Sequence, residues 1–271
     1  MNQNKIESIR AALIHYDGCE FDLRLTKDNV LILFHDAWYK QRRIIETNFK
    51  DIKNIQTFEQ LIQDPEIEEL VNGGNKTLWI EAKEEHNQKN KCIELYNKRI
   101  AEGILKQLYK SHLNLENIFI ISFNITILKN LKGVNKLLIV PYYDCSSDGK
   151  FARKGRMSFK KLLVYLRMVR SIKHHIQKAK ELGLNGLLFP KQYFRGFFSI
   201  FQPSLENILT FAGEDVILGT DADTFEEEQY YNDLVVITNY NGKRNSNYRK
   251  KPLIFHGGLE MENAERMALS T

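Results

Sequence analysis

Cysteine is scarce in this chain: three occur among 271 residues, and they stand far apart at Cys19, Cys92 and Cys145. No CxxC pair is present, so the sequence predicts neither a disulfide framework nor a zinc site. No apolar run is long enough to span a bilayer, and the first ten residues lack the apolar core of a secretion signal. We therefore expect a cytoplasmic protein with free thiols.

Hydrophobic residues are plentiful, at 43% of the chain, so a sizeable core is available, and one large barrel fits as well as two small domains. Of these two arrangements we expect a single domain over residues 1–271. The formal net charge of +5 indicates an anionic substrate, an acidic membrane surface or nucleic acid as a partner. Basic residues are concentrated in residues 150–180, without a recognised nucleic-acid motif. We expect no nucleic-acid partner.

Residues 151–180 form the longest predicted helix, with an apolar stripe that includes Leu162, Leu166 and Val169 and basic residues on the remaining surface. Core packing is the favoured interpretation of the stripe. A basic amphipathic helix also fits peripheral contact with anionic lipid, together with the aromatic loop at residues 193–201. Membrane contact is therefore kept as the alternative.

Strand-like and helix-like segments alternate along most of the chain. A first strand holds Glu20 and Asp22, and further apolar strands are predicted at residues 77–83, 118–123, 137–143, 186–190, 216–220 and 234–238. Such βαβα alternation predicts a parallel sheet covered by helices, which means a doubly wound sheet or a (β/α)8 barrel. Functional residues are expected at the carboxyl ends of the strands in either fold.

Charged and apolar residues alternate from Glu20 to Leu25, which places Glu20, Asp22 and Arg24 on one face of a strand. Residues 30–34 form a short apolar strand that returns His35 to the same end. In the strand at residues 77–83 the same alternation puts Glu81 and Lys83 on one face. A solvated hairpin with one polar face is the alternative interpretation of the first segment.

Glu20-Phe-Asp22, Leu-Thr-Lys-Asp28, His35-Asp36 and Ile80-Glu-Ala-Lys83 resemble the glycerophosphodiester phosphodiesterase family. The family pattern runs HRG, EN, a helix, ExD, LTxDG, HD and ExK, followed by SF and a late TD. Ser122-Phe123 and Thr238-Asn239 stand at the last two positions. The resemblance covers nearly the whole chain and implies a (β/α)8 TIM barrel that cleaves phosphodiesters.

The sequence departs from the family at its start, because no HRG strand precedes Ile6. The motif stands near the end instead, as His256-Gly257-Gly258 followed by Glu262-Asn263. We interpret this as a circular permutation, in which Leu253 to Phe255 form a parallel strand between the strands of Glu20 and Val236. A truncated start with a chance His-Gly-Gly and the beginning of a second copy are the alternatives.

Three carboxylates at one barrel mouth repel each other unless a cation lies between them. Their hard oxygens suit Mg²⁺ or Ca²⁺ better than zinc, and the resemblance implies that Glu20, Asp22 and Glu81 are the metal ligands. Lys83 and Arg24 are expected to bind the phosphate oxygens.

Cleavage of a phosphodiester needs one group that takes up a proton and one that gives a proton, and His35 and His256 are the candidates. The family's arginine after the second histidine is Gly257 here, which puts substrate affinity and identity in doubt. The leading hypothesis is a metal-dependent hydrolase of a glycerophosphodiester or a related small phosphodiester. A phospholipase C-like lyase that releases a cyclic phosphate and a non-catalytic barrel that binds a phosphorylated ligand are the alternatives.

Overall fold

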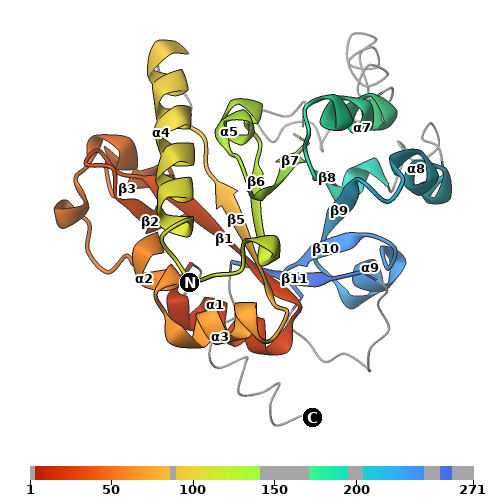
Figure 1. The fold of residues 1–271 in the computed structure, drawn as a ribbon, viewed down its shortest axis with the longest axis horizontal. Helices are drawn as coiled ribbons and strands as arrows, with labels where there is room; N and C mark the ends of the chain where they lie inside the picture. Colours follow the sequence, from red (N-terminus) through yellow and green to blue (C-terminus); the bar gives the residue numbers. More distant parts are fainter. Residues whose placement is uncertain (1–3, 86–89, 141–170, 195–203, 241–250, 258–271) are drawn as a thin grey trace, which may run out of the picture.

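A computed structural model describes residues 4–85, 90–140, 171–194, 204–240 and 251–257. Its main sheet runs in the order β11-β10-β9-β8-β7-β6-β5-β1, and a further pairing of β11 with β1 closes it into a barrel of parallel strands (Figure 1). The barrel strands are β1 (Gly18–Leu25), β5 (Thr77–Ala82), β6 (Ile118–Ser122), β7 (Asn135–Ile139), β8 (Gly186–Phe189), β9 (Ile217–Ala222), β10 (Val235–Thr238) and β11 (Leu253–His256). The predicted (β/α)8 TIM barrel is confirmed.

The last strand, β11, lies where the sequence predicts it. It pairs in parallel with β1, where Glu20 is opposite His256, and with β10, where Val236 is opposite Leu253. Figure 1 shows blue β11 beside red β1, although the two strands come from opposite ends of the chain. The position of the strand is confirmed, whereas the circular permutation that we infer for its origin stays a prediction.

Helices surround the barrel in Figure 1. The described ones are α1 (Ile6–His15), α2 (Phe58–Ile62), α3 (Pro65–Asn72), α4 (Asn90–Leu108), α5 (Ile125–Asn130), α7 (Ser171–Glu181), α8 (Leu205–Ala212) and α9 (Phe225–Tyr230). The helical spacing of Ile6, Ile9 and Leu13 predicts one apolar face, and in α1 this face is buried, with Ile9 and Leu13 fully covered. Helical spacing of apolar residues therefore identified the face of α1 that packs on the barrel.

The apolar spacing of residues 57–71 predicts a helix that is interrupted or kinked near Pro65, and the structure has two helices there. Thr57 caps α2 through a capping box with Gln60, and the Asp64 carboxylate accepts the backbone N–H groups of Glu66 and Ile67 at the start of α3. Pro65 is the first residue of α3, where its missing N–H has no intrahelical partner to lose. The proline therefore interrupts the helical stretch, as the first of the two predicted options has it, by starting a second helix.

The proposed membrane-contacting segments fall mostly outside the described residues. Of the helix predicted at residues 151–180 the structure describes α7, and of the aromatic loop it describes Tyr193 and Phe194, whose buried rings pack on Phe189. Among the described residues, no helix is both long enough and apolar enough to cross a membrane. Peripheral membrane contact stays a prediction.

The segment that follows β1 carries His35, one of the two predicted catalytic histidines. β2 (Leu31–Leu33) runs antiparallel to β1, and the Phe34 N–H donates to the Asp22 carbonyl at 3.1 Å. A hairpin of β3 (Trp38–Tyr39) and β4 (Arg42–Arg43) follows, and after it come the short helical turns η1 (Ile44–Glu46) and η2 (Phe49–Asp51). Elsewhere in the described chain, η3 (Leu115–Asn117) and η5 (Lys191–Tyr193) are turns of the same kind. His35 is thus returned towards the carboxyl end of β1, as predicted.

Apolar side chains fill the barrel interior below its carboxyl mouth. One buried cluster contains Trp79, Ile121, Leu137, Leu188, Val235 and Ile254, each from a different strand. The ring of Trp79 stacks on that of Phe119, with centroids 4.6 Å apart. Because packed side chains close the interior, the polar groups of β1, β5 and β11 are gathered at the mouth.

Candidate active site

Three carboxylates converge at the carboxyl mouth. In the pairing of β1 with β5, Asp22 lies opposite Glu81. Glu20 lies two residues before Asp22 and therefore points to the same face of β1. One oxygen from each of the three lies within 4.8 Å of the others. Their exposed fractions are 1% for Glu20, 1% for Asp22 and 7% for Glu81. The predicted acidic cluster is therefore compact and buried.

Lys83 bridges two of these carboxylates. Its Nζ lies 2.8 Å from Asp22 Oδ1 and 2.7 Å from Glu81 Oε1. Burial lowers the pKa of Lys83, but Glu81 and Asp22 raise it by more, so the amine stays charged. When all three carboxylates are ionised, the single ammonium leaves the cluster with two negative charges.

The three carboxylates differ in their tendency to ionise. Burial, reinforced by the charges of Asp22 and Glu81, raises the pKa of Glu20 well above its usual range. Burial also raises the pKa of Glu81. For Asp22 burial acts in the same direction, but Lys83 and a hydrogen bond from Asn4 outweigh it and lower the pKa. Glu20 is thus the carboxylate that most needs a further positive charge.

The donor set fits a hard divalent cation. Glu20 Oε1 is buried and has no hydrogen-bond partner, although an unpaired buried carboxylate oxygen is costly. Carboxylate oxygens are the ligands that Mg²⁺ and Ca²⁺ prefer. A divalent ion would satisfy this oxygen and cancel the remaining charge of the cluster.

Both predicted histidines lie near the cluster. His256 Nε2 lies 3.4 Å from Glu20 Oε2, and its Nδ1 lies 2.8 Å from Asn239 Oδ1. His35 is more exposed, and its Nδ1 lies 2.8 Å from Asp36 Oδ1. The charge of His35 acts on the pKa of both Asp22 and His256, while burial is the main cause that lowers the pKa of His256. Two imidazoles therefore lie near one group of carboxylates.

Arg24 makes its contacts in the described structure to other groups of the protein, and the phosphate contact that we expect of it stays a prediction. Its Nε donates to the His35 carbonyl at 2.8 Å, and its Nη1 donates to Glu85 Oε1 at 3.3 Å. Glu85 is itself buried and also accepts from Arg43 Nη2 at 2.5 Å. These contacts fix the backbone that carries His35, so the guanidinium is used within the protein.

Asn4 is a member of the site that our sequence reasoning missed. Its Nδ2 donates to Asp22 Oδ2 at 2.8 Å, and its Oδ1 accepts the Asp22 N–H at 2.9 Å. The available signal was the family's EN pair, which precedes a helix as Asn4 precedes α1. We assigned that pair to Glu262-Asn263, which lie outside the described residues.

Gly257 stands where the family has arginine, and its backbone explains the glycine. Its φ of +71° lies in the left-handed region, which favours glycine over residues with a Cβ. Its N–H donates to the Glu20 carbonyl at 2.8 Å and lies 3.3 Å from Glu20 Oε2. The position contributes a backbone donor to the site in place of a guanidinium.

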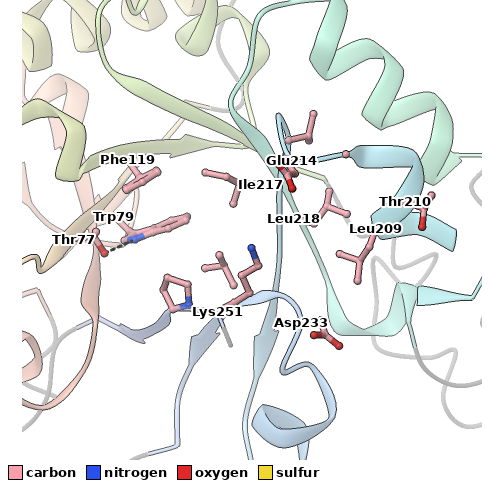
Figure 2. A pocket seen from close by; sticks show the side chains of 14 residues that line it. Thr77, Trp79, Phe119, Leu209, Thr210, Glu214, Ile217, Leu218, Asp233 and Lys251 are labelled. Carbon is pink, nitrogen blue, oxygen red and sulfur yellow. Dashed lines mark hydrogen bonds between the residues drawn. The ribbon is translucent and has the colours of Figure 1, made fainter. Parts of the chain in front are cut away.

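The amino-terminal mouth of the barrel, opposite the acidic cluster, is mainly apolar. A cavity of about 710 Å³ lies there, lined mainly by apolar side chains that include Trp79, Phe119 and Leu209. Figure 2 shows the stacked Trp79 and Phe119 on one side of it and Leu209 on the other. None of the predicted site residues lines this cavity. The chemistry is therefore gathered at the carboxyl mouth.

A parallel barrel with ionisable side chains at its carboxyl mouth defines the class of the protein as a (β/α)8-barrel enzyme. The model of the glycerophosphoryl diester phosphodiesterase family matches residues 2–185, and the chain belongs to that family. This confirms the resemblance on which we based the expected activity, that of a glycerophosphodiester phosphodiesterase. No curated protein matches the chain.

Solved structures of similar fold come from several bacteria. A glycerophosphodiester phosphodiesterase from Parabacteroides distasonis is 18% identical, with a TM-score of 0.61 over 98% of this chain and 90% of that one. One from Thermotoga maritima is 14% identical, with a TM-score of 0.58 over 99% and 92%. An Oleispira antarctica phosphodiesterase in complex with the product sn-glycerol-3-phosphate is 13% identical, with a TM-score of 0.55 over 99% and 91%. These likenesses support the fold.

Proposed function

We propose that the chain is a metal-dependent hydrolase that cleaves a glycerophosphodiester, or a related small phosphodiester, to an alcohol and a phosphomonoester. The observation that carries this proposal is the convergence of three buried carboxylates around an unpartnered Glu20 oxygen. Such a cluster is costly without a cation and suits a divalent one.

Glu20, Asp22 and Glu81 would hold Mg²⁺ or Ca²⁺, which when bound neutralises phosphate charge and polarises a phosphoryl oxygen. Lys83 remains charged beside Asp22 and Glu81 and is placed to bind a non-bridging phosphate oxygen. The contacts of Arg24 support a different role from the direct phosphate contact that we expected. Through the His35 carbonyl, Arg24 positions the loop that carries this histidine.

His35 and His256 are the proposed acid and base. One imidazole takes the proton of the attacking water, and the other protonates the leaving alkoxide. Their location near the carboxylate cluster supports this proposal, since both interact electrostatically with Asp22. Each ring is oriented through Nδ1, by Asp36 in one case and by Asn239 in the other.

Two alternatives differ in their products. A lyase would use the substrate's own hydroxyl and release a cyclic phosphate, whereas a degenerate barrel would bind a phosphorylated ligand without turnover. The Oleispira neighbour is described with sn-glycerol-3-phosphate as its product, which is an open-chain monoester. This favours hydrolysis as the proposal for the present chain.

Phosphorus NMR of glycerophosphocholine incubated with the protein separates these functions. With Mg²⁺ or Ca²⁺ we expect a glycerol phosphomonoester, and with EDTA we expect no conversion. A cyclic phosphate as the released product would identify the lyase. Absence of turnover with either ion, while glycerol phosphate still binds, would identify the non-catalytic barrel and refute the hydrolase.

A further inference from the structure

Three neighbouring strand ends bring together His256, Asn239 and Asp223. His256 ends β11, Asn239 follows β10, and Asp223 follows β9. His256 Nδ1 lies 2.8 Å from Asn239 Oδ1, and Asn239 Nδ2 donates to Asp223 Oδ1 at 2.8 Å. The side chains thus form a chain of hydrogen bonds that runs away from the carboxylate cluster.

The direction of each hydrogen bond follows from the groups involved. An ionised carboxylate only accepts hydrogen bonds, so the amide NH₂ of Asn239 must face Asp223. The amide oxygen then faces His256, and this oxygen only accepts. The proton of a neutral His256 imidazole must therefore be on Nδ1, which leaves the lone pair on Nε2.

Asp223 is itself held in place and kept ionised. Lys191 Nζ lies 2.5 Å from Asp223 Oδ2 and 2.9 Å from Glu227 Oε2. Hydrogen bonds from Lys191 and Asn239 lower the pKa of Asp223. The Asn239 backbone N–H also donates to the Ala222 carbonyl at 2.9 Å, which ties the end of β10 to β9.

We propose that the Asp223–Asn239 pair positions His256, holding its imidazole in the Nδ1–H tautomer with the Nε2 lone pair turned towards Glu20. Nε2 lies 3.4 Å from Glu20 Oε2, on the side of the proposed metal ligands. Asp223 and Asn239 act through His256 and do not contact these ligands themselves in the described structure. The importance of the pair for turnover rests on the proposed function, whereas its effect on the tautomer does not.

Two variants and a control test the pair. Asn239→Leu keeps the approximate size of the side chain and removes the acceptor for Nδ1–H. The double variant Asp223→Asn with Asn239→Asp exchanges the two groups. The amide at position 223 then donates to the carboxylate at position 239, and that carboxylate accepts the hydrogen bond from His256. Asn72→Leu is the control. Asn72 is an exposed asparagine at the end of α3, and its side chain hydrogen-bonds to the backbone of His112 and Asn114.

The first readout is the nitrogen NMR spectrum of His256 at about pH 8, which separates a protonated Nδ1 from a bare one without substrate. We expect the Nδ1–H form in the parent, the exchanged pair and Asn72→Leu, and a mixture of tautomers in Asn239→Leu. An unchanged tautomer in Asn239→Leu would overturn the proposal, as would an Nε2–H form in the parent.

The second readout is turnover of glycerophosphocholine with Mg²⁺. General acid or base catalysis contributes about 100- to 10,000-fold, so we expect Asn239→Leu to lower kcat by about 10- to 1,000-fold with little change in KM, and the exchanged pair to recover most of the loss. Loss of turnover with an unchanged tautomer would assign Asn239 a merely structural role. If the parent itself shows no turnover, the proposed function fails, and the tautomer alone decides on the pair.

Discussion

Glu20 illustrates how a buried carboxylate is tolerated at one end of a barrel. It accepts the Gly257 N–H through Oε2 and faces His256, yet its second oxygen has no partner. Its burial beside Asp22 and Glu81 raises its pKa, so ionisation of Glu20 depends on a positive charge at the mouth. The residue therefore couples the charge of the site to cation binding.

Metal affinity is the direct measure of this coupling. Asp22→Asn and Glu81→Gln should each weaken Mg²⁺ or Ca²⁺ binding by at least about 10- to 100-fold, since even loss of outer-shell partners costs that much. Titration calorimetry of EDTA-treated protein measures the effect. Glu59→Gln, which changes an exposed glutamate of α2, is the matched control. Unchanged affinity in both site variants would place the metal elsewhere.

Turnover is the measure for His35. His35→Ala should fold normally, because the side chain is largely exposed, yet lose about 100- to 10,000-fold in kcat if the imidazole transfers a proton. His174→Ala removes an exposed imidazole from α7 and should leave kcat unchanged. Steady-state kinetics with circular dichroism as the folding check would decide, and full activity in His35→Ala would exclude this residue from the chemistry.

The sequence was informative for residues whose place follows from strand periodicity. Alternation put Glu20 and Asp22 on one face, and parallel strands brought Glu81 to the same mouth. Asn4 and Asn239 were not predicted, because their roles depend on contacts between elements that are distant in sequence. Arg24 shares the predicted face, but local alternation cannot show that Glu85 and a carbonyl oxygen bind its guanidinium first.

At the scale of elements, long periodic segments were predictable and short ones were not. The barrel strands and α1 show clear alternation or helical spacing, and they lie close to the predicted positions. The two-residue strands β3 and β4 have no period to detect. Pro65 predicts an interruption between α2 and α3, whereas the residues at which each helix begins depend on the caps at Thr57 and Asp64. Hydrogen bonds to capping side chains therefore set the helix boundaries in this segment.

Helix α7 should give the fold a measurable pH dependence. Burial lowers the pKa of His175 to about 4, and its ring packs on Phe189. Between the ordinary value of 6.5 and about 4 the unfolded chain holds a proton that the folded state lacks. The stabilising effect of the neutral ring is thus complete above pH 6.5 and is lost as the pH falls through this window.

Denaturant unfolding at several pH values between about 7 and 4 measures this effect. We expect the free energy of unfolding of the parent to fall more steeply with decreasing pH than that of His175→Phe, which keeps a ring against Phe189 without a titrating group. His112→Phe, which changes an exposed histidine outside α7, should keep the parental slope. Equal slopes in the parent and His175→Phe would show that this histidine does not contribute.

At the scale of the molecule, closure by β11 joins the two ends of the chain. The strand pairs with both β1 and β10, and its side chains Ile254 and Phe255 are buried. The Asn4 N–H donates to the Gly257 carbonyl at 2.8 Å, so the start of the described chain also depends on the end of β11. Without the strand, two sheet edges and the barrel interior would be exposed to water.

Deletion after Lys250 should therefore prevent cooperative folding. A chain that ends at Gly258 retains β11 and is the control for loss of the remaining residues alone. Circular dichroism and thermal unfolding of the two shortened proteins compare them directly. A soluble, cooperative and active protein without residues 251–271 would show that β11 is dispensable and that His35 works without a second histidine.

The central claim is that this barrel cleaves phosphodiesters with a cation held by Glu20, Asp22 and Glu81. Its most direct test is glycerophosphocholine hydrolysis by EDTA-treated protein while Mg²⁺ or Ca²⁺ is added back to the parent and to Glu81→Gln. Activity of the parent should return with saturation at a single site, and Glu81→Gln should need a much higher ion concentration or remain inactive. Hydrolysis that persists in EDTA, or identical metal dependence in the two proteins, would contradict the account.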